Sequence, residues 1–116
     1  MAPTGKPLIW LSGEVKTPPF TPAARREVGA LLRNLQLGRS IGMPHSRPMP
    51  AIGSRCHELR VNAGDKAWRV FYRIDPDAIL VVGVHEKRTE QTTKSAIDAC
   101  RGRLRMYDAA TKPGDL

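Results

Sequence analysis

The chain has 116 residues and a formal net charge of +8, with a sequence pI near 10.2. This length fits one domain with a modest hydrophobic core. No run of roughly 18 apolar residues is present, which excludes a membrane-spanning helix, and the N-terminus lacks the apolar core and cleavage site of a signal peptide. We therefore expect a cytoplasmic protein, and the positive charge favours a polyanionic partner such as nucleic acid, or an acidic protein.

The N-terminal part predicts a short strand followed by a helix. Residues 6–11 (KPLIWL) form an apolar run. After a loop with two adjacent prolines, Thr21 and Pro22 have the residue types preferred at a helix N-cap and at the first helical position. Gly38 has the type expected just beyond the helix end. Apolar residues between them recur at helical spacing, which predicts one buried stripe. The stripe consists of Ala24, Val28, Leu31, Leu32 and Leu35.

Residues 39–55 are the least regular part of the chain, because three prolines and two glycines prevent a single helix or strand. A structureless loop of this length in a small domain is usually functional or mobile. His45, Arg47 and Arg55 give it a positive or titratable character. Two interpretations remain open: a plain crossover to the sheet edge, or a segment that contacts substrate.

Three strand-like runs follow in close succession: residues 56–62 (CHELRVN), 66–74 (KAWRVFYRI) and 78–89 (AILVVGVHEKRT). The turn-forming segments between them, NAGD and DPD, predict hairpins and hence an antiparallel meander. The third run is apolar through Val84, as expected for a central strand that is covered on both faces. It then changes to HEKR (residues 85–88), a mostly basic cluster.

Alternation within the second run assigns its side chains to two faces of the predicted sheet. One face receives Trp68, Val70, Tyr72 and Ile74, and the other receives Arg69, Phe71 and Arg73. Trp68 and Tyr72 are expected in the core. An exposed Phe71 between arginines would suit stacking on RNA bases, although the second helix could equally cover it. Arg69 could also simply pair with Glu58 across the hairpin.

A second helix is expected to begin at Thr92 or Thr93. The order strand, helix, loop, three strands, helix predicts a small α+β domain, with helices packed on an antiparallel-rich sheet of about four strands. We expect a single domain over residues 1–116, with an ordered core of about residues 6–108 and a flexible tail at 109–116. The apolar stripe of the second helix consists of Thr93, Ile97, Cys100, Leu104 and Tyr107.

The sequence carries no recognisable metal or cofactor site. Its three histidines are isolated, and Cys56 and Cys100 lie at ligand spacing neither from each other nor from a histidine. We expect both cysteines as reduced thiols, with a single disulfide as the alternative. A glycine-rich phosphate loop is missing as well, so neither a metal nor a cofactor is expected.

The basic and aromatic residues can nevertheless support RNA cleavage. The 2′-hydroxyl of RNA is a built-in nucleophile that attacks the adjacent phosphorus. A protein needs only to hold the backbone bent, neutralise charge on the phosphate and assist proton transfer. Arginine suits the second task, because its planar fork meets two phosphate oxygens.

Three short motifs carry a resemblance to a known family: ELRV (residues 58–61), WRVFYRID (68–75) and VHEKRT (84–89), followed by a helix. In this order and spacing they resemble the RelE/ParE superfamily of bacterial toxins, and in particular its HigB-like, phage-derived branch. The resemblance covers roughly residues 6 to 108. It implies a RelE-like fold and the toxin of a type II toxin–antitoxin pair, which cleaves mRNA on the translating ribosome without a metal.

The resemblance also implies roles for individual residues. Arg69 and Arg88 would stabilise the phosphate, and Arg60 and Lys87 would position the RNA. The tyrosine or histidine that better-known members carry near the C-terminus has no counterpart at the matching place. The histidine before the basic cluster, or Tyr107, would therefore assist proton transfer. The full set of expected site residues is Arg69, Arg88 and His85 for catalysis, and Arg60, Lys87, Arg73, Phe71 and Arg55 for RNA binding.

The implied partners are a cognate antitoxin of the helix-turn-helix type, mRNA on the ribosome, and operator DNA only through the antitoxin complex. Two other functions remain open. One is a ParE-like toxin that inhibits DNA gyrase without cutting RNA, and the other is a basic RNA-binding module without activity. The clustered arginines on one sheet face favour the nuclease over a ParE-like toxin.

Overall fold

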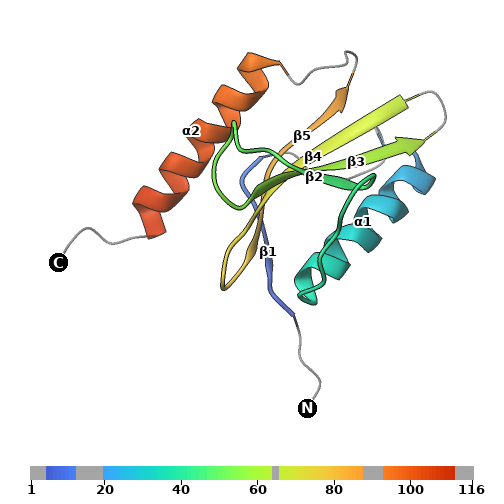
Figure 1. Ribbon diagram of the computed structural model, residues 1–116, viewed down its shortest axis with the longest axis horizontal. Helices are drawn as coiled ribbons and strands as arrows, with labels where there is room; N and C mark the ends of the chain where they lie inside the picture. Colours follow the sequence, from blue (N-terminus) through green and yellow to red (C-terminus); the bar gives the residue numbers. More distant parts are fainter. Residues whose placement is uncertain (1–4, 13–19, 64–65, 88–92, 112–116) are drawn as a thin grey trace.

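The computed structural model describes residues 5–12, 20–63, 66–87 and 93–111 of the chain (Figure 1). The order of elements is strand, helix, four strands, helix. In chain order they are β1 (Leu8–Trp10), α1 (Pro22–Gln36), β2 (Ser46–Pro48), β3 (Cys56–Ala63), β4 (Lys66–Ile74), β5 (Ile79–Lys87) and α2 (Lys94–Thr111).

The strands form one sheet in the order β1-β5-β4-β3-β2. Strands β3, β4 and β5 are antiparallel neighbours, which confirms the predicted meander. Strand β1 pairs in parallel with β5, and Leu8 lies opposite Ile79. The fold is therefore α+β with a mostly antiparallel sheet in the RelE-like order.

The two helices cover opposite faces of the sheet (Figure 1). The α1 face holds the larger core, which includes the predicted core residues Trp68 and Tyr72. The α2 face holds a second core, in which Cys100 and Leu104 of the helix pack with Phe71 and Leu80 of the sheet. Both faces of β5 are thus covered, as its apolar sequence predicted.

Local sequence signals place α1 correctly. Thr21 has extended backbone angles, and its Oγ1 accepts a hydrogen bond of 3.1 Å from the N–H of Ala24. The helix ends at Gln36 with Leu37 as its C-cap, and Gly38 then adopts a φ of +85° and donates its N–H to the carbonyl of Leu35. This left-handed conformation is why a glycine stands at this position.

The second helix begins as expected and ends later than expected. Thr93 precedes it, and its Oγ1 accepts a hydrogen bond of 3.2 Å from the N–H of Ala96, as an N-cap does. Residues 109–111 are helical rather than part of a flexible tail. Thr111 also donates its hydroxyl to the carbonyl of Tyr107, which closes this last turn.

Strand β2 was not predicted, because it lies within the irregular segment 39–55. It is only three residues long and pairs with β3 at the sheet edge, with Arg47 opposite Glu58. Pro48 fits there because an edge strand does not need its missing N–H on the open side. The buried hydroxyl of Ser46 shares a hydrogen bond of 2.6 Å with Tyr72, which ties the strand to the larger core.

An irregularity in β5 changes which side chains share a face. Phe71 pairs with Gly83, whereas the next residue of β4, Tyr72, pairs with Val81, so Val82 is the extra residue of a bulge. Beyond the bulge the alternation is shifted by one residue. His85 consequently lies opposite Arg69 and on the same face.

Replacing Gly83 by alanine should destabilise this part of the fold. A Cβ there would lie 3.1 Å from Sγ of Cys100 and 3.4 Å from both the Phe71 ring and the Arg103 guanidinium. Crowding of this kind typically costs about 1–3 kcal/mol. Urea denaturation should show the loss, whereas Gly29→Ala on α1, where no atom lies within 4 Å of the new Cβ, should not be destabilising. Equal midpoints for Gly83→Ala and the native chain would contradict the tight packing.

No helix within the described residues is long and apolar enough to cross a membrane.

Candidate active site

Three of the predicted site residues lie side by side across three strands. Arg60 on β3 is directly opposite Arg69 on β4, and Arg69 is directly opposite His85 on β5. Residues that are directly opposite project to the same face of a sheet. This face is the one that α2 covers, because the ring of Phe71 in the α2-side core lies 5.1 Å from the His85 ring. We call Arg60, Arg69 and His85 the cross-strand row.

Arg69 is the most buried member of this row, with 6% of its side chain exposed. Its Nη1 donates a hydrogen bond of 2.9 Å to the carbonyl of Trp68. Burial lowers the pKa of Arg69, Glu58 opposes this effect, and the neighbouring charges of Arg60 and Arg47 add to it. The buried guanidinium of Arg69 therefore lies near one carboxylate and two other guanidinium groups.

Glu58 links Arg69 to the edge strand β2. Its fully buried carboxylate accepts a hydrogen bond of 2.9 Å from Nε of Arg47, whereas Nε of Arg69 lies 3.8 Å from the same oxygen. The alternative expectation that Arg69 pairs with Glu58 is therefore confirmed, as an ion pair of 3.8 Å that is longer than the contact of Glu58 with Arg47. From the sequence, Arg47 was noted only as one of the residues that make segment 39–55 positive or titratable, and it was not assigned to the site. The structure places it beside the row because β2 pairs with β3.

Two buried donors in the row have no hydrogen-bond partner among the described residues. They are the Nε atoms of Arg60 and Arg69, although Nε of Arg69 keeps its ion-pair contact of 3.8 Å with Glu58. Unpaired buried donors are rare in native proteins and call for an explanation such as an absent ion. Two like charges directly opposite each other are also unfavourable. An anion placed between the two arginines would relieve both features.

Phe71 corrects the expectation of an exposed aromatic for base stacking. Only 1% of it is exposed, because α2 and the segment before β3 cover the ring. The sequence had left this alternative open, and alternation along β4 cannot reveal what covers a face.

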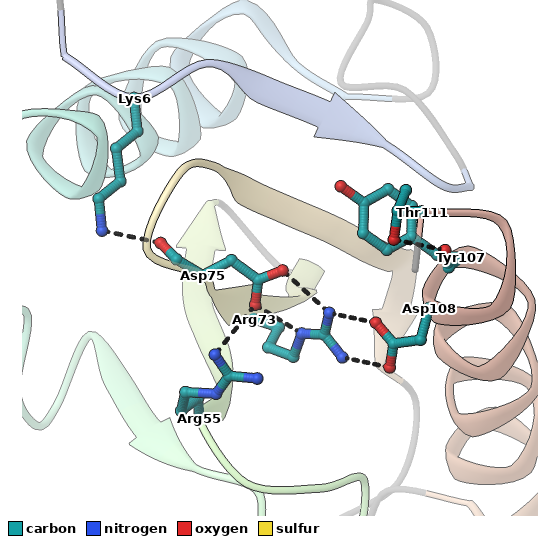
Figure 2. Close-up of polar contacts among 7 residues, drawn as sticks. All are labelled: Lys6, Arg55, Arg73, Asp75, Tyr107, Asp108 and Thr111. Atoms are coloured by element: carbon teal, nitrogen blue, oxygen red, sulfur yellow. Dashed lines mark hydrogen bonds and ion pairs between the residues drawn. The ribbon is translucent and has the colours of Figure 1, made fainter. Parts of the chain in front are cut away.

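Arg73 corrects a second expectation, because its guanidinium is engaged in ion pairs rather than available for RNA. Figure 2 shows it between two carboxylates. Its Nε and Nη2 donate to Asp75 at 2.7 and 2.9 Å, and its Nη1 and Nη2 donate to Asp108 at 3.0 and 2.8 Å. These hydrogen bonds raise the pKa of Arg73 above its ordinary value, with Asp108 contributing most. The residue joins β4 to α2.

Arg55 lies outside the cross-strand row, at the start of β3. Its side chain is half exposed, and Nη1 is 3.5 Å from Oδ1 of Asp75. Lys6 donates to the backbone carbonyl of Asp75 at 2.9 Å, so the N-terminal segment reaches the same cluster (Figure 2).

The structure describes two of the three remaining predicted residues, Lys87 and Tyr107. Lys87 is the last residue of β5 and its backbone is paired with Ala67. Arg88 lies outside the described residues. Tyr107, the alternative to His85 for proton transfer, packs against the α2-side core.

Both cysteines are free and buried on the α2 side of the sheet. Burial raises the pKa of Cys100 to about 11 and raises that of Cys56. At pH 8 both thiols should therefore be protonated and react slowly with a disulfide reagent in the folded protein. After unfolding in denaturant, both thiols should react fast with the reagent. The absorbance of the thiolate that the reagent releases measures the rate. Rapid reaction of either thiol in the native protein would contradict this burial.

Within residues 5–12, 20–63, 66–87 and 93–111, no group of three or more His, Cys, Asp or Glu side chains is arranged to hold a metal ion.

Comparison with protein families gives a match over most of the chain. The model of the family described as phage-derived protein Gp49-like (DUF891) matches residues 19–105, which include the whole cross-strand row. Neither curated proteins nor solved structures give a match.

Proposed function

Because the chain belongs to the phage-derived Gp49-like family, a HigB-like toxin family of the RelE/ParE superfamily, we propose that it cleaves mRNA on the ribosome. The observation that carries this proposal is the pair Arg60 and Arg69, which lie directly opposite each other and whose buried Nε donors have no hydrogen-bond partner among the described residues. Such a pair suits the phosphate of an RNA strand, since arginine forks match phosphate oxygens.

In the proposed reaction the 2′-oxygen forms a bond to the adjacent phosphorus, and the bond from phosphorus to the 5′-oxygen breaks. The products are a 2′,3′-cyclic phosphate and a 5′-hydroxyl end. Arg69 and Arg60 stabilise the charge that develops on the phosphate. Lys87, the last residue of β5, and Arg88, the next residue in the sequence, add to this task.

His85 is our proposed group for proton transfer, because it stands next to Arg69 in the row. The 2′-hydroxyl must lose a proton and the 5′-oxygen must gain one. An imidazole can serve either step near neutral pH.

The toxin family implies an antitoxin partner. We propose that this antitoxin is a helix-turn-helix protein that masks the basic surface, and that operator DNA is bound only through the complex. A net charge of +8 favours an acidic masking segment through charge complementarity.

Induced expression in a bacterium with mapping of transcript 5′ ends tests the proposal. The native chain should arrest growth and create new 5′ ends at regular codon positions, whereas Arg69→Gln combined with Arg88→Gln should not. Arg25→Gln combined with Arg26→Gln is the matched control, since these exposed residues lie on α1 and remove the same charge. Growth arrest with intact transcripts would instead indicate another target such as gyrase, and no arrest would remove the toxin assignment.

A further inference from the structure

An open pocket of about 320 Å³ lies between α2 and the connection from β2 to β3. It contains none of the residues of the cross-strand row. Four arginines and one carboxylate supply its charged groups. These are Arg55, Arg73, Arg101, Arg105 and Asp108.

The pocket has an excess of positive charge. Arg73 is neutralised by Asp75 and Asp108, and Arg55 makes a contact of 3.5 Å with Asp75. Arg101 and Arg105 are exposed on α2, and neither makes a hydrogen bond or ion pair within the described residues. Asp98, which is already paired with Lys94, is the acidic group whose charge acts on Arg101 and Arg105, so the cluster keeps a net positive charge.

The backbone of Arg55 adds a second observation. Its φ is +62°, a left-handed conformation that glycine adopts freely and that costs an arginine about 1 kcal/mol or more. Its carbonyl accepts the N–H of Ile74, which fixes this turn at the start of β3. Arg55 thus combines a strained backbone conformation with a long cationic side chain that lines the pocket. Backbone strain of this kind is typical of binding sites.

The position of the pocket relates it to the row. Arg55 immediately precedes β3, and Arg60 lies within it, five positions further along the chain, which corresponds to at most roughly 17 Å for an extended chain. An anionic chain of several units can therefore reach both places, whereas a single small anion cannot.

We propose that this pocket binds a backbone phosphate of the same RNA strand whose scissile phosphate lies at Arg60 and Arg69. The inference rests on the proposed function and names a second contact for its substrate. RNA fits better than a protein segment, because the apolar lining residues Ile52, Cys56 and Leu104 are buried and offer no anchor for an apolar side chain. The accessible groups are arginine forks, which match phosphate oxygens.

Salt-dependent binding tests this inference independently of cleavage. The probe is a fluorescein-labelled single-stranded RNA with 2′-O-methyl riboses, which lacks the nucleophile and stays intact. Arg101→Gln combined with Arg105→Gln should weaken binding and reduce the slope of log affinity against log salt by roughly 0.7, the loss of one phosphate contact on a single strand. Arg25→Gln combined with Arg26→Gln removes the same charge from α1, on the other face, and should leave the slope unchanged.

Length separates a specific contact from a general loss of charge. A dinucleotide has only one internucleotide phosphate and cannot occupy both places at once, so the pocket variant should lose less affinity for the dinucleotide than for the long RNA. An unchanged slope with the long RNA, or an equal loss for the dinucleotide, would overturn the pocket assignment. Cleavage on the ribosome is measured separately. Cleavage by the native chain with an unchanged slope would therefore reject the pocket alone, and a reduced slope without cleavage would reject the nuclease alone.

Discussion

Replacing Arg60 by glutamine is expected to lower the rate of mRNA cleavage by about 100- to 1000-fold, the usual cost of removing one preorganised donor from a charged transition state. The structure favours this residue for a clean test. Arg60 is only partly buried, and its Nε has no hydrogen-bond partner. The free energy of unfolding should therefore change little, or even rise, because the unfavourable pairing with Arg69 is lost.

Arg69→Gln should give a comparable loss of cleavage together with a loss of stability. Glu58 is fully buried and would lose its contact of 3.8 Å with Arg69 while it keeps the hydrogen bond from Arg47. Single-turnover cleavage of ribosome-bound mRNA and urea denaturation, measured on both variants, separate the two effects. Native rates for Arg60→Gln at unchanged stability would show that the cross-strand row does not contact the reacting phosphate.

The cross-strand row itself was only partly predictable. The alternation of side chains correctly assigned Arg60 and Arg69 to faces of the sheet, because β3 and β4 pair without a register shift. The bulge at Val82 then shifts the alternation of β5, and this shift is what brings His85 opposite Arg69. Gly83 was the available signal, since a lone glycine inside a strand often marks a bulge.

Local signals predicted the helix starts, because a capping threonine acts on an amide only three residues away. Long-range contacts left no such signal. The bidentate pairing of Arg73 with Asp108 joins residues 35 positions apart. In the sequence, Arg73 lay on a strand face that was expected to be open, and Asp108 lay next to the tail that was expected to be flexible. Nothing in these positions indicated that the two side chains pair. The same limit explains why Arg47 was not assigned to the row before β2 was known.

The Arg73 cluster carries the second large prediction: Arg73→Met should lower the free energy of unfolding by about 3 kcal/mol. Removing one partner from a buried ion pair typically costs about 3–5 kcal/mol, because the remaining charge stays buried and unpaired. The lower end applies here, since Asp108 is 34% exposed and Asp75 retains Arg55 at 3.5 Å. Urea denaturation followed by circular dichroism measures the change.

Variants of the two partners of Arg73 should differ in how much stability they lose and in which part of the fold opens. Asp108→Asn leaves the pairing with Asp75 in place, so it should cost less than Arg73→Met, and the double variant should cost less than the sum of the two singles. Hydrogen exchange should show faster opening of the C-terminal half of α2, because Asp108 is its tie to β4. Lys94→Met provides the control at the other end of the helix, where the ion pair with Asp98 is exposed and its loss should leave the midpoint unchanged. A midpoint for Arg73→Met equal to that of this control would mean that Arg73 does not fasten α2 to the sheet, and that the cationic pocket beside it is not held in place by this cluster.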